Sequence, residues 1–333
     1  MKIFKEEYKD EQLALSFMDT YFKGKKYAIF DIETTGLSPK NCQVILTGFV
    51  VPKGDGNYEM IQYFAESLSD EASVLMYTAD LLNQMDYVIT FNGKGFDMPF
   101  IEKRMDTLNI NSLNKAPKLY NLDIYKIVKS FSDIKKFVPN LKQKTLENFL
   151  GLYETRSDQI DGGKSVDQYF EYLVTKDPNL ESTILLHNRD DVMQLNRLCN
   201  ILKKVDFHKA MAEYGFPLEK TTIDNLKLTK NQFKITGNTC LSDALVYDDS
   251  INLKLNITER QLQLTLKVYE KENLFFVDLR DLGLNSNLLD YFRNCNGLYL
   301  DHFLMLKVDG EINYKALNLL GKYLIERIEL NEN

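Results

Sequence analysis

Two acidic side chains stand two positions apart near the N-terminus. Asp31 and Glu33 end the apolar run 26–33, whose β-branched and aromatic residues predict a strand that stops at Thr34-Thr35-Gly36. Residues i and i+2 of a strand leave the same face, with Cα atoms about 6 to 7 Å apart, so one divalent cation can reach both carboxylates. Such a cation would offset their repulsion. The alternative is a pair of acids at an exposed strand end.

A third acid, Asp97, follows the loop Asn92-Gly93-Lys94-Gly95 and begins a predicted helix over 97–108. A strand predicted over 86–91 precedes the loop, and this order implies a parallel crossover. Asp97 would then lie at the carboxyl ends of the strands, where ligands bind in α/β sheets, although an Asp at this position can also be a simple N-cap. Asn92 fits two roles, donation to a ligand oxygen or formation of the turn.

A histidine and a fourth acid share one face of a long helix predicted over 180–204. His187 and Asp191 fall on its inward stripe, which the apolar positions 184, 195, 198 and 202 define, whereas Asp190 lies about 100° of helical rotation away. His187, with an ordinary pKa near roughly 6.5, is suited to accept a proton from water. Because His187 and Asp191 are i and i+4 neighbours, a structural ion pair between them is the alternative.

The elements that must position these residues form an α/β pattern followed by a different one. Strands predicted over 26–33, 43–51 and 58–64 are joined by short connections, which predicts an antiparallel meander. Further strands are expected over 86–91 and 118–122, with helices over 69–84, 97–108, 124–130, 144–151, 165–174 and 180–204. Beyond residue 207, strands are expected over 226–236, 250–257, 261–269 and 274–279, with a helix over 314–330. We therefore predict a leader (1–23), an α/β domain (24–205) and a smaller accessory α+β domain (206–333).

Composition narrows the class of protein. The N-terminus has no apolar signal segment, and no run approaches the roughly 18 apolar residues of a membrane span, so we expect a cytoplasmic protein with no membrane contact. The four cysteines stand singly, which predicts neither a zinc site nor a disulfide framework. The net charge of −7 argues against binding of nucleic acid by bulk electrostatics. Residues 115–145, however, hold eight lysines against two acids, as either a phosphate-binding surface or solvated helix faces.

Three motifs, in chain order, resemble a known family. DIETTG (31–36), FNGKGFDMPF (91–100) and HNRDDV (187–192) are similar to the three exonuclease motifs of the DEDD superfamily on the ribonuclease-H-like fold. The likeness is greatest to the YprB-like branch, which segments 141–152 and 161–173 also resemble, and it covers residues 24–204. The resemblance implies a mixed sheet of three antiparallel and then two parallel strands, flanked by helices.

The resemblance also implies a set of site residues. Asp31, Glu33, Asp97 and Asp191 would bind two divalent ions, Mg²⁺ or Mn²⁺, with Asp31 bridging them, and His187 would orient or deprotonate the attacking water. The spacing here is H-x3-D, whereas family members with His generally have H-x4-D. Contacts to substrate are expected from Thr34, Asn92 and Phe96. Phe96 and Phe100 would stack on the terminal bases, with core packing of Phe100 as the alternative.

The implied activity is a metal-dependent 3′-to-5′ exonuclease with a two-metal mechanism. Its substrate would be single-stranded DNA or RNA with a free 3′ end. The rival hypotheses are a noncatalytic nucleic-acid-binding module on the same fold and a structure-selective endonuclease. The sequence identifies no protein partner.

Overall fold

The computed structural model describes residues 1–10, 16–110, 117–152, 162–248, 252–283, 285–293, 295 and 297–331. The chain divides into two compact units. The first comprises Met1–Ser16, Gly24–Lys115 and Leu119–Val205, and the second comprises Phe17–Lys23, Ala116–Lys118 and Asp206–Asn333. No helix within the described ranges is long and apolar enough to cross a membrane.

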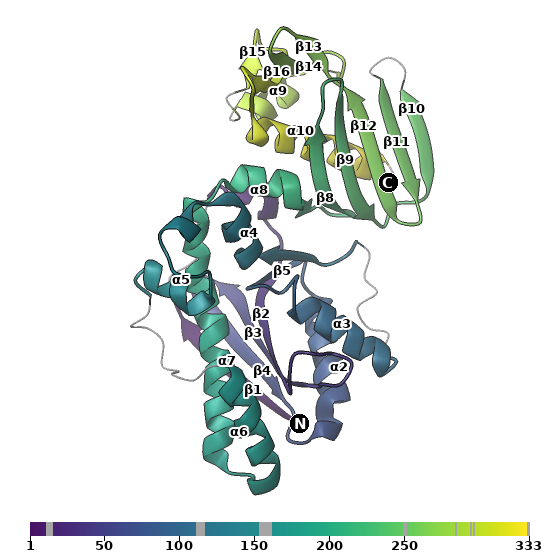
Figure 1. Ribbon diagram of the computed structural model, residues 1–333. Coiled ribbons are helices and arrows are strands. Elements are labelled where there is room, and N and C mark those ends of the chain that lie inside the picture. Colours follow the sequence, from purple (N-terminus) through teal and green to yellow (C-terminus); the bar gives the residue numbers. More distant parts are fainter. Residues whose placement is uncertain are drawn as a thin grey trace. The chain divides into compact units, whose positions relative to one another are not determined.

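The first unit is built on a six-stranded mixed sheet (Figure 1). In spatial order the strands are β1 (Lys2–Lys9), β4 (Asn57–Phe64), β3 (Val44–Gly54), β2 (Tyr27–Thr34), β5 (Tyr87–Thr90) and β6 (Tyr120–Asp123). Strands β1, β4, β3 and β2 pair antiparallel, whereas β5 pairs parallel with β2 and with β6. The predicted meander and parallel crossover are therefore confirmed, and β2 occupies the point where the two patterns meet.

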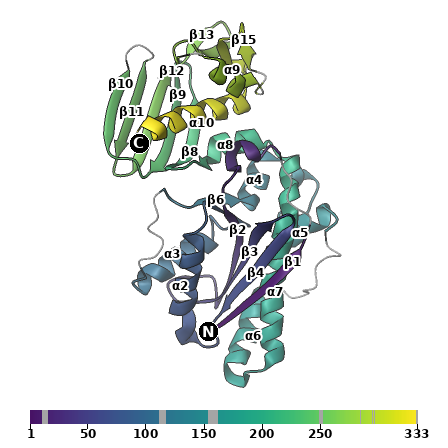
Figure 2. The same cartoon turned by 180° about the vertical axis from the view of Figure 1, so that it is seen from behind.

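Strand β1 corrects the expectation of a leader over 1–23. Lys2–Lys9 pair with β4 along its length, as the view from behind also shows (Figure 2). Tyr8 stacks on Tyr58 of β4 with ring centroids 5.5 Å apart. Charged residues hid this strand in the sequence because an edge strand keeps most of its side chains in water and uses charge to discourage further pairing.

Helices cover both faces of this sheet. On one face lie α2 (Glu71–Leu82) and α3 (Asp97–Thr107), and on the other lie α6 (Gly162–Thr175) and α7 (Pro178–Leu198), as Figure 1 shows. The smaller helices of the unit are η1 (Leu68–Asp70), α4 (Ile124–Phe131), η2 (Ile134–Lys136), α5 (Gln143–Phe149) and η4 (Cys199–Lys204). Phe30 and Ile32 belong to the core beneath α2 and α3. Since side chains alternate along β2, Asp31 and Glu33 point to the opposite face, toward α7.

A buried ion pair joins α2, α3 and the start of β3. Arg104 donates through Nε and Nη2 to the two carboxylate oxygens of Glu71 at 2.7 and 2.6 Å. The backbone N–H of Val44 donates to the same carboxylate at 2.9 Å. Both charged side chains are less than a tenth exposed. This bidentate pair therefore ties the two helices to the sheet on the side away from Asp31.

The second unit is an antiparallel α+β structure. One sheet has the order β10 (Ala244–Asp248), β11 (Leu253–Thr258), β12 (Gln261–Lys267), β9 (Gln232–Thr239), β8 (Thr221–Leu228) and β7 (Phe216–Pro217). The other contains β13 (Tyr269–Lys271), β14 (Leu274–Asp278), β16 (Phe303–Val308), β15 (Leu298–Tyr299) and β17 (Glu311–Ile312). The described helices of the unit are α1 (Asp19–Phe22), α8 (Phe207–Tyr214), α9 (Ser286–Arg293) and α10 (Tyr314–Asn331). The long α10 lies across the first of these sheets (Figure 2).

One predicted strand of this unit was wrong. Residues 226–236 are not a single strand but parts of β8 and β9 joined by a turn at 229–231. The turn has neither Gly nor Pro; Thr229 closes it by donating from its N–H and its hydroxyl to the carbonyl of Gln232. The expected strand 250–257 corresponds to β11, and its first two positions lie outside the described residues.

Candidate metal centre

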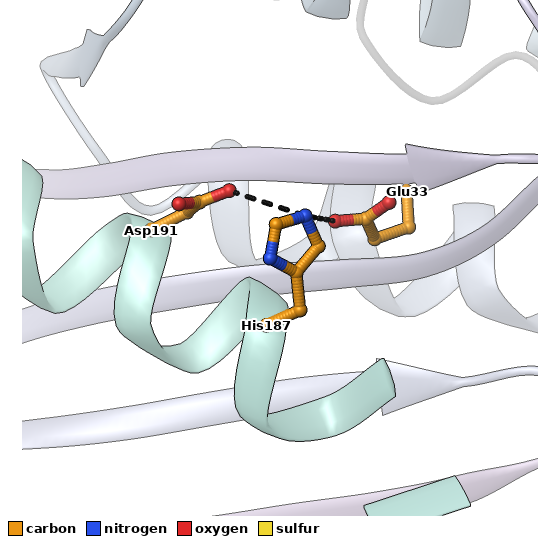
Figure 3. A group of neighbouring side chains, drawn as sticks. All are labelled: Glu33, His187 and Asp191. Carbon is orange, nitrogen blue, oxygen red and sulfur yellow. Dashed lines mark ion pairs between the residues drawn. The ribbon is translucent and has the colours of Figure 1, made fainter. Parts of the chain in front are cut away.

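Three side chains from β2 and α7 meet on the face of the sheet that α6 and α7 cover. The Nε2 atom of His187 lies 3.6 Å from a carboxylate oxygen of Glu33 and 3.7 Å from one of Asp191 (Figure 3). One ligand atom from each residue lies within 4.8 Å of the other two. Glu33 and His187 are buried, whereas Asp191 is half-buried. His187 and Asp191 thus reach one point from successive turns of α7, as their i, i+4 spacing requires.

The neighbouring Asp190 has a different environment. It is buried, and its carboxylate lies 3.8 Å from the guanidinium of Arg189. It does not belong to the cluster that Glu33, His187 and Asp191 form. This separation agrees with the 100° rotation between consecutive helical residues.

Asp31 is held by an amide relay that begins on β4. Asn188 donates from Nδ2 to Asp31 Oδ2 at 3.1 Å, and its own Oδ1 accepts from Gln62 Nε2 at 2.9 Å. Gln62 also donates to the Leu185 carbonyl at 2.9 Å. Gln62 Nε2 can only donate, so the Asn188 atom that faces it must be the oxygen Oδ1. The nitrogen Nδ2 of Asn188 therefore faces Asp31. The relay thus orients the Asp31 carboxylate while leaving its second oxygen to other partners.

Space for this relay comes from a glycine on β3. Gly48 pairs with Asp31 across the β2–β3 ladder. A Cβ at position 48 would lie 2.0 Å from Asn188 Oδ1. The absence of a side chain there is what allows α7 to bring Asn188 down onto the sheet.

Asp97 approaches the same end of β2 from α3. Its Oδ1 accepts from the backbone N–H of Ile32 at 3.2 Å, between Asp31 and Glu33, and the side chain is buried. It lies in the first turn of α3, where the helix dipole favours a negative charge. The structure thus brings the carboxylates of Asp97, Asp31 and Glu33 to one segment of one strand.

The buried carboxylates resist ionisation. Burial raises the pKa of Asp31 well above its ordinary value, and the charges of Asp97, Asp191 and Glu33 raise it further. Burial likewise raises the pKa of Glu33 to about 7, with His187 opposing the shift. It also raises the pKa of Asp97 to about 7, against the hydrogen bond from Ile32. In the protein alone, too little positive charge surrounds these carboxylates to stabilise their ionised forms.

Asp123 organises the loop in front of α3. Its carboxylate caps α4 by accepting from the N–H of Lys126, and it also accepts from the N–H groups of Asn92 and Lys94 at 3.0 Å each. Asn92 has a φ of 66°, and its carbonyl accepts from the N–H groups of Gly95 and Phe96. The structure therefore places Asn92 in the turn itself, and Asp123 is a cap and a loop clamp.

The other expected substrate contacts lie beside this centre. Thr34 is buried, and its hydroxyl donates to the Gly36 carbonyl at 2.7 Å. Phe96 is half-buried and packs on Phe100 at a centroid distance of 5.4 Å. Phe100 is only 1% exposed, so core packing describes it and base stacking does not.

Several residues that shape the centre were missed by sequence reasoning. Asn188 and Gly48 were not predicted to contribute, nor was Gln143, which donates to the backbone carbonyl of Asp191 at 2.8 Å and to Glu147 at 3.0 Å. The sequence did contain an indication for Asn188, since it occupies the inward stripe of α7, where a polar amide needs a hydrogen-bond partner. It contained none for Gly48 and Gln143, because their contacts join segments far apart in the chain.

The donor set fits a divalent cation. Carboxylate oxygens are the preferred ligands of Mg²⁺ and Mn²⁺, and imidazole nitrogen suits Mn²⁺ as well. Four acids and a histidine stand around a short stretch of β2, and the described residues supply no Lys or Arg ion pair to Asp31, Glu33 or Asp97. A cation would supply the missing positive charge and lower the raised pKa values.

Comparison with known proteins agrees with this architecture. A profile of the RNase_H superfamily matches residues 28–203, more than half of the chain. The chain belongs to the RNase_H superfamily. The matched residues hold all of β2, except its first residue, together with α3 and α7, and so include the four carboxylates and His187. No curated protein matches the chain.

One solved structure that resembles the chain is the family B DNA polymerase of the hyperthermophilic archaeon Pyrobaculum calidifontis. The two share 20% identity with a TM-score of 0.44, over 54% of this chain and 24% of the polymerase chain. This chain thus spans about a quarter of that polymerase.

Membership of the RNase_H superfamily confirms the predicted fold class, a mixed sheet flanked by helices with a further C-terminal α+β unit. Strand β1 is an addition to the five strands that were expected. The superfamily and the cluster of Glu33, His187 and Asp191 together support a nuclease that uses divalent metal and binds nucleic acid.

The lysines of the lysine-rich segment lie on α4, η2 and α5 of the first unit and at Lys142, the N-cap of α5. Lys118 belongs to the second unit, and Lys115 is outside the described residues. Lys136 pairs with Asp133 at 2.7 Å. Phe137, beside it, is 72% exposed.

Proposed function

We propose that the first unit is a divalent-metal-dependent 3′-to-5′ exonuclease of the DEDD type that acts on single-stranded nucleic acid. The observation that carries this proposal is the convergence of Asp31, Glu33, Asp97, Asp191 and His187 from β2, α3 and α7. No structural need of the fold explains two buried and two half-buried acids in one place, since their ionised forms destabilise the sheet that holds them.

The metal-binding residues in this proposal are the four carboxylates. Asp31 is coupled electrostatically both to Asp97 of α3 and to Asp191 of α7, which supports a role in which it would hold both ions. When bound, Mg²⁺ or Mn²⁺ would lower the pKa of a ligand water and stabilise charge on the phosphodiester oxygens. Asn188 would hold Asp31 in one orientation, and Gln143 would hold the α7 backbone at Asp191.

His187 is the proposed general base. Its Nε2 faces the carboxylates of Glu33 and Asp191 and is nearly closed off from solvent. These carboxylates would stabilise the imidazolium that forms when His187 takes a proton from the attacking water. The H-x3-D spacing suits this arrangement, because one turn of α7 separates the base from the acid beside it.

The polarity and branch of the enzyme rest on the three motifs. DIETTG, FNGKGFDMPF and HNRDDV resemble those of the YprB-like branch. Thr34 and Phe96 lie next to the carboxylates on β2 and α3, and we propose that they contact the 3′-terminal nucleotide. Asn92 would act through its backbone turn.

The test uses a single-stranded oligonucleotide with a 5′ label and either a free or a blocked 3′ end. We expect the purified protein with Mn²⁺ to shorten only the free end, one nucleotide at a time. Asp31→Asn should lower the rate at least about 100-fold, as does removal of a group that stabilises transition-state charge. Asp133→Asn, an exposed acid of the same unit, is the matched control.

The rival functions give different products. Cleavage of the blocked or a circular substrate would identify an endonuclease. Binding of the oligonucleotide without cleavage, unchanged in Asp31→Asn, would identify a noncatalytic binding module.

A further inference from the structure

The first sheet of the second unit has one apolar and one polar face. Phe233 and Ile235 of β9 are buried and point toward α10. A Cβ at Gly321 of α10 would lie 2.1 Å from Leu226 of β8, so this glycine permits close packing of helix on sheet. On the opposite, outward face, the side chains of β9, β11 and β12 are all polar. They are Gln232, Lys234, Thr236, Asn238, Lys254, Asn256, Thr258, Gln261, Gln263, Thr265 and Lys267.

Lysines on this outward face line up across the strands. The ladder registers Lys227 with Lys234, Lys234 with Thr265, Thr265 with Lys254, and Lys254 with Tyr247. Neighbouring strands lie about 4.8 Å apart, so Lys227 and Lys234 are direct neighbours and Lys254 stands two strands farther along. Like charges placed directly opposite one another destabilise a sheet. A row of this kind favours an anionic ligand over a purely structural role.

The charge of this face contrasts with that of the chain. Strands β9, β11 and β12 contain no Asp or Glu, whereas the whole protein has 48 acids and a net charge of −7. Among the residues that the structure describes, no carboxylate forms an ion pair with Lys227, Lys234, Lys254 or Lys267. The lysines are therefore available to an external anion.

The face is concave and contains an exposed aromatic ring. A groove of about 590 Å³ is lined by Tyr247, Asp248, Lys254, Gln263, Thr265 and Lys267, and Lys234 pairs with Thr265 on the neighbouring strand. Tyr247 is 59% exposed, and Lys254 Nζ lies 5.2 Å from its ring centroid. An aromatic platform beside lysines and amides is what proteins use to bind single strands, where rings stack on bases and cations contact phosphates.

We propose that this outward face of β8 to β12 binds single-stranded nucleic acid, with Lys234 and Lys254 on the phosphate backbone and Tyr247 against a base. The proposal goes beyond the nuclease activity, because it concerns a surface of the second unit and requires no cleavage. Recognition is independent of base sequence, since lysine contacts to phosphate carry no sequence information.

The test measures binding of a fluorescein-labelled oligo(dT) of about 20 nucleotides by anisotropy, with full-length protein in EDTA. Each phosphate contact with a single strand contributes about 0.7 to the slope of log K against log salt. Lys234→Gln/Lys254→Gln should therefore reduce the slope by about 1.4, so the weakening between 50 and 200 mM salt shrinks about seven-fold. Tyr247→Ala should weaken binding at least about five-fold.

Lys271→Gln/Lys307→Gln is the matched control, because it removes the same charge from the other sheet of the unit. Its salt slope should equal that of the wild type. Equal slopes in the two double variants, or no binding by the wild type, would overturn the proposal. Equally tight binding of poly-glutamate would also overturn it and assign the face to an acidic polypeptide. Because binding is read in EDTA, loss of the proposed nuclease activity does not affect these outcomes.

Discussion

The raised pKa values of the clustered carboxylates predict that these residues destabilise the metal-free protein at neutral pH. Glu33 has a pKa of about 7 in the folded protein against 4.5 in the unfolded chain. The folded state therefore holds the proton more tightly, and the free energy of unfolding falls as the pH rises from 4.5 through 7. A shift of this size corresponds to roughly 3 kcal/mol, present below pH 4.5 and lost above pH 7.

The perturbation that tests this is Glu33→Gln, which keeps the shape of the side chain and removes its charge. At pH 8 in EDTA we expect the variant to be more stable than the wild type by up to roughly 3 kcal/mol. For a unit of this size that difference raises Tm by roughly 6 to 12 °C. At pH 3.5 the two proteins should unfold at similar temperatures, because Glu33 is then largely protonated in both states.

Addition of Mn²⁺ at pH 8 should reverse the order. An ion that binds only the folded state stabilises it by about 4.1 kcal/mol at 1,000 times its Kd, which exceeds the roughly 3 kcal/mol advantage of the variant, and the variant lacks a ligand. Differential scanning calorimetry of both proteins, with Asp133→Asn as the control, measures each case. A variant no more stable than the wild type at pH 8 in EDTA would refute the electrostatic reasoning.

Three further predictions concern residues around the centre. Gly48→Ala should displace Asn188, because the new Cβ would lie 2.0 Å from its Oδ1, and should lower the nuclease rate at least about ten-fold while costing about 1–3 kcal/mol in urea unfolding; a wild-type rate would contradict the role given to the relay. Glu71→Ala should cost about 3–5 kcal/mol because it leaves Arg104 buried and unpaired, and a loss under 1 kcal/mol would show that the pair is dispensable. Asp123→Ala should cost about 1–2 kcal/mol as a lost helix cap and should increase amide exchange at residues 92–95, and unchanged exchange there would exclude the loop clamp.

Local sequence patterns were sufficient to predict most of the architecture of the first unit. Alternation along β2 placed Asp31 and Glu33 on one face, and the helical period of α7 separated Asp191 from Asp190, because both signals depend only on backbone geometry. Strand β1 was not predicted, because its charged residues are typical of an edge strand rather than of a buried one. The turn at Thr229 was not predicted, because a side-chain hydrogen bond closes it and it contains neither Gly nor Pro.

Contacts between distant segments were not predictable from one sequence. The relay from Gln62 through Asn188 to Asp31 spans 126 and 157 residues of chain in its two hydrogen bonds. The partners of Glu71 and Asp123 likewise come from segments that only the folded sheet brings together. Periodicity identifies which face of an element is buried, but it does not identify the residue that lies opposite.

The central claim is that the carboxylates of β2, α3 and α7 hold divalent metal. Titration of Mn²⁺ at pH 8, followed by electron paramagnetic resonance of the free ion, tests it most directly. The account predicts two bound ions in the wild type and in Asp133→Asn, and loss of both in Asp31→Asn, the proposed bridging ligand. No bound Mn²⁺ in the wild type, or the same binding in Asp31→Asn, would contradict it.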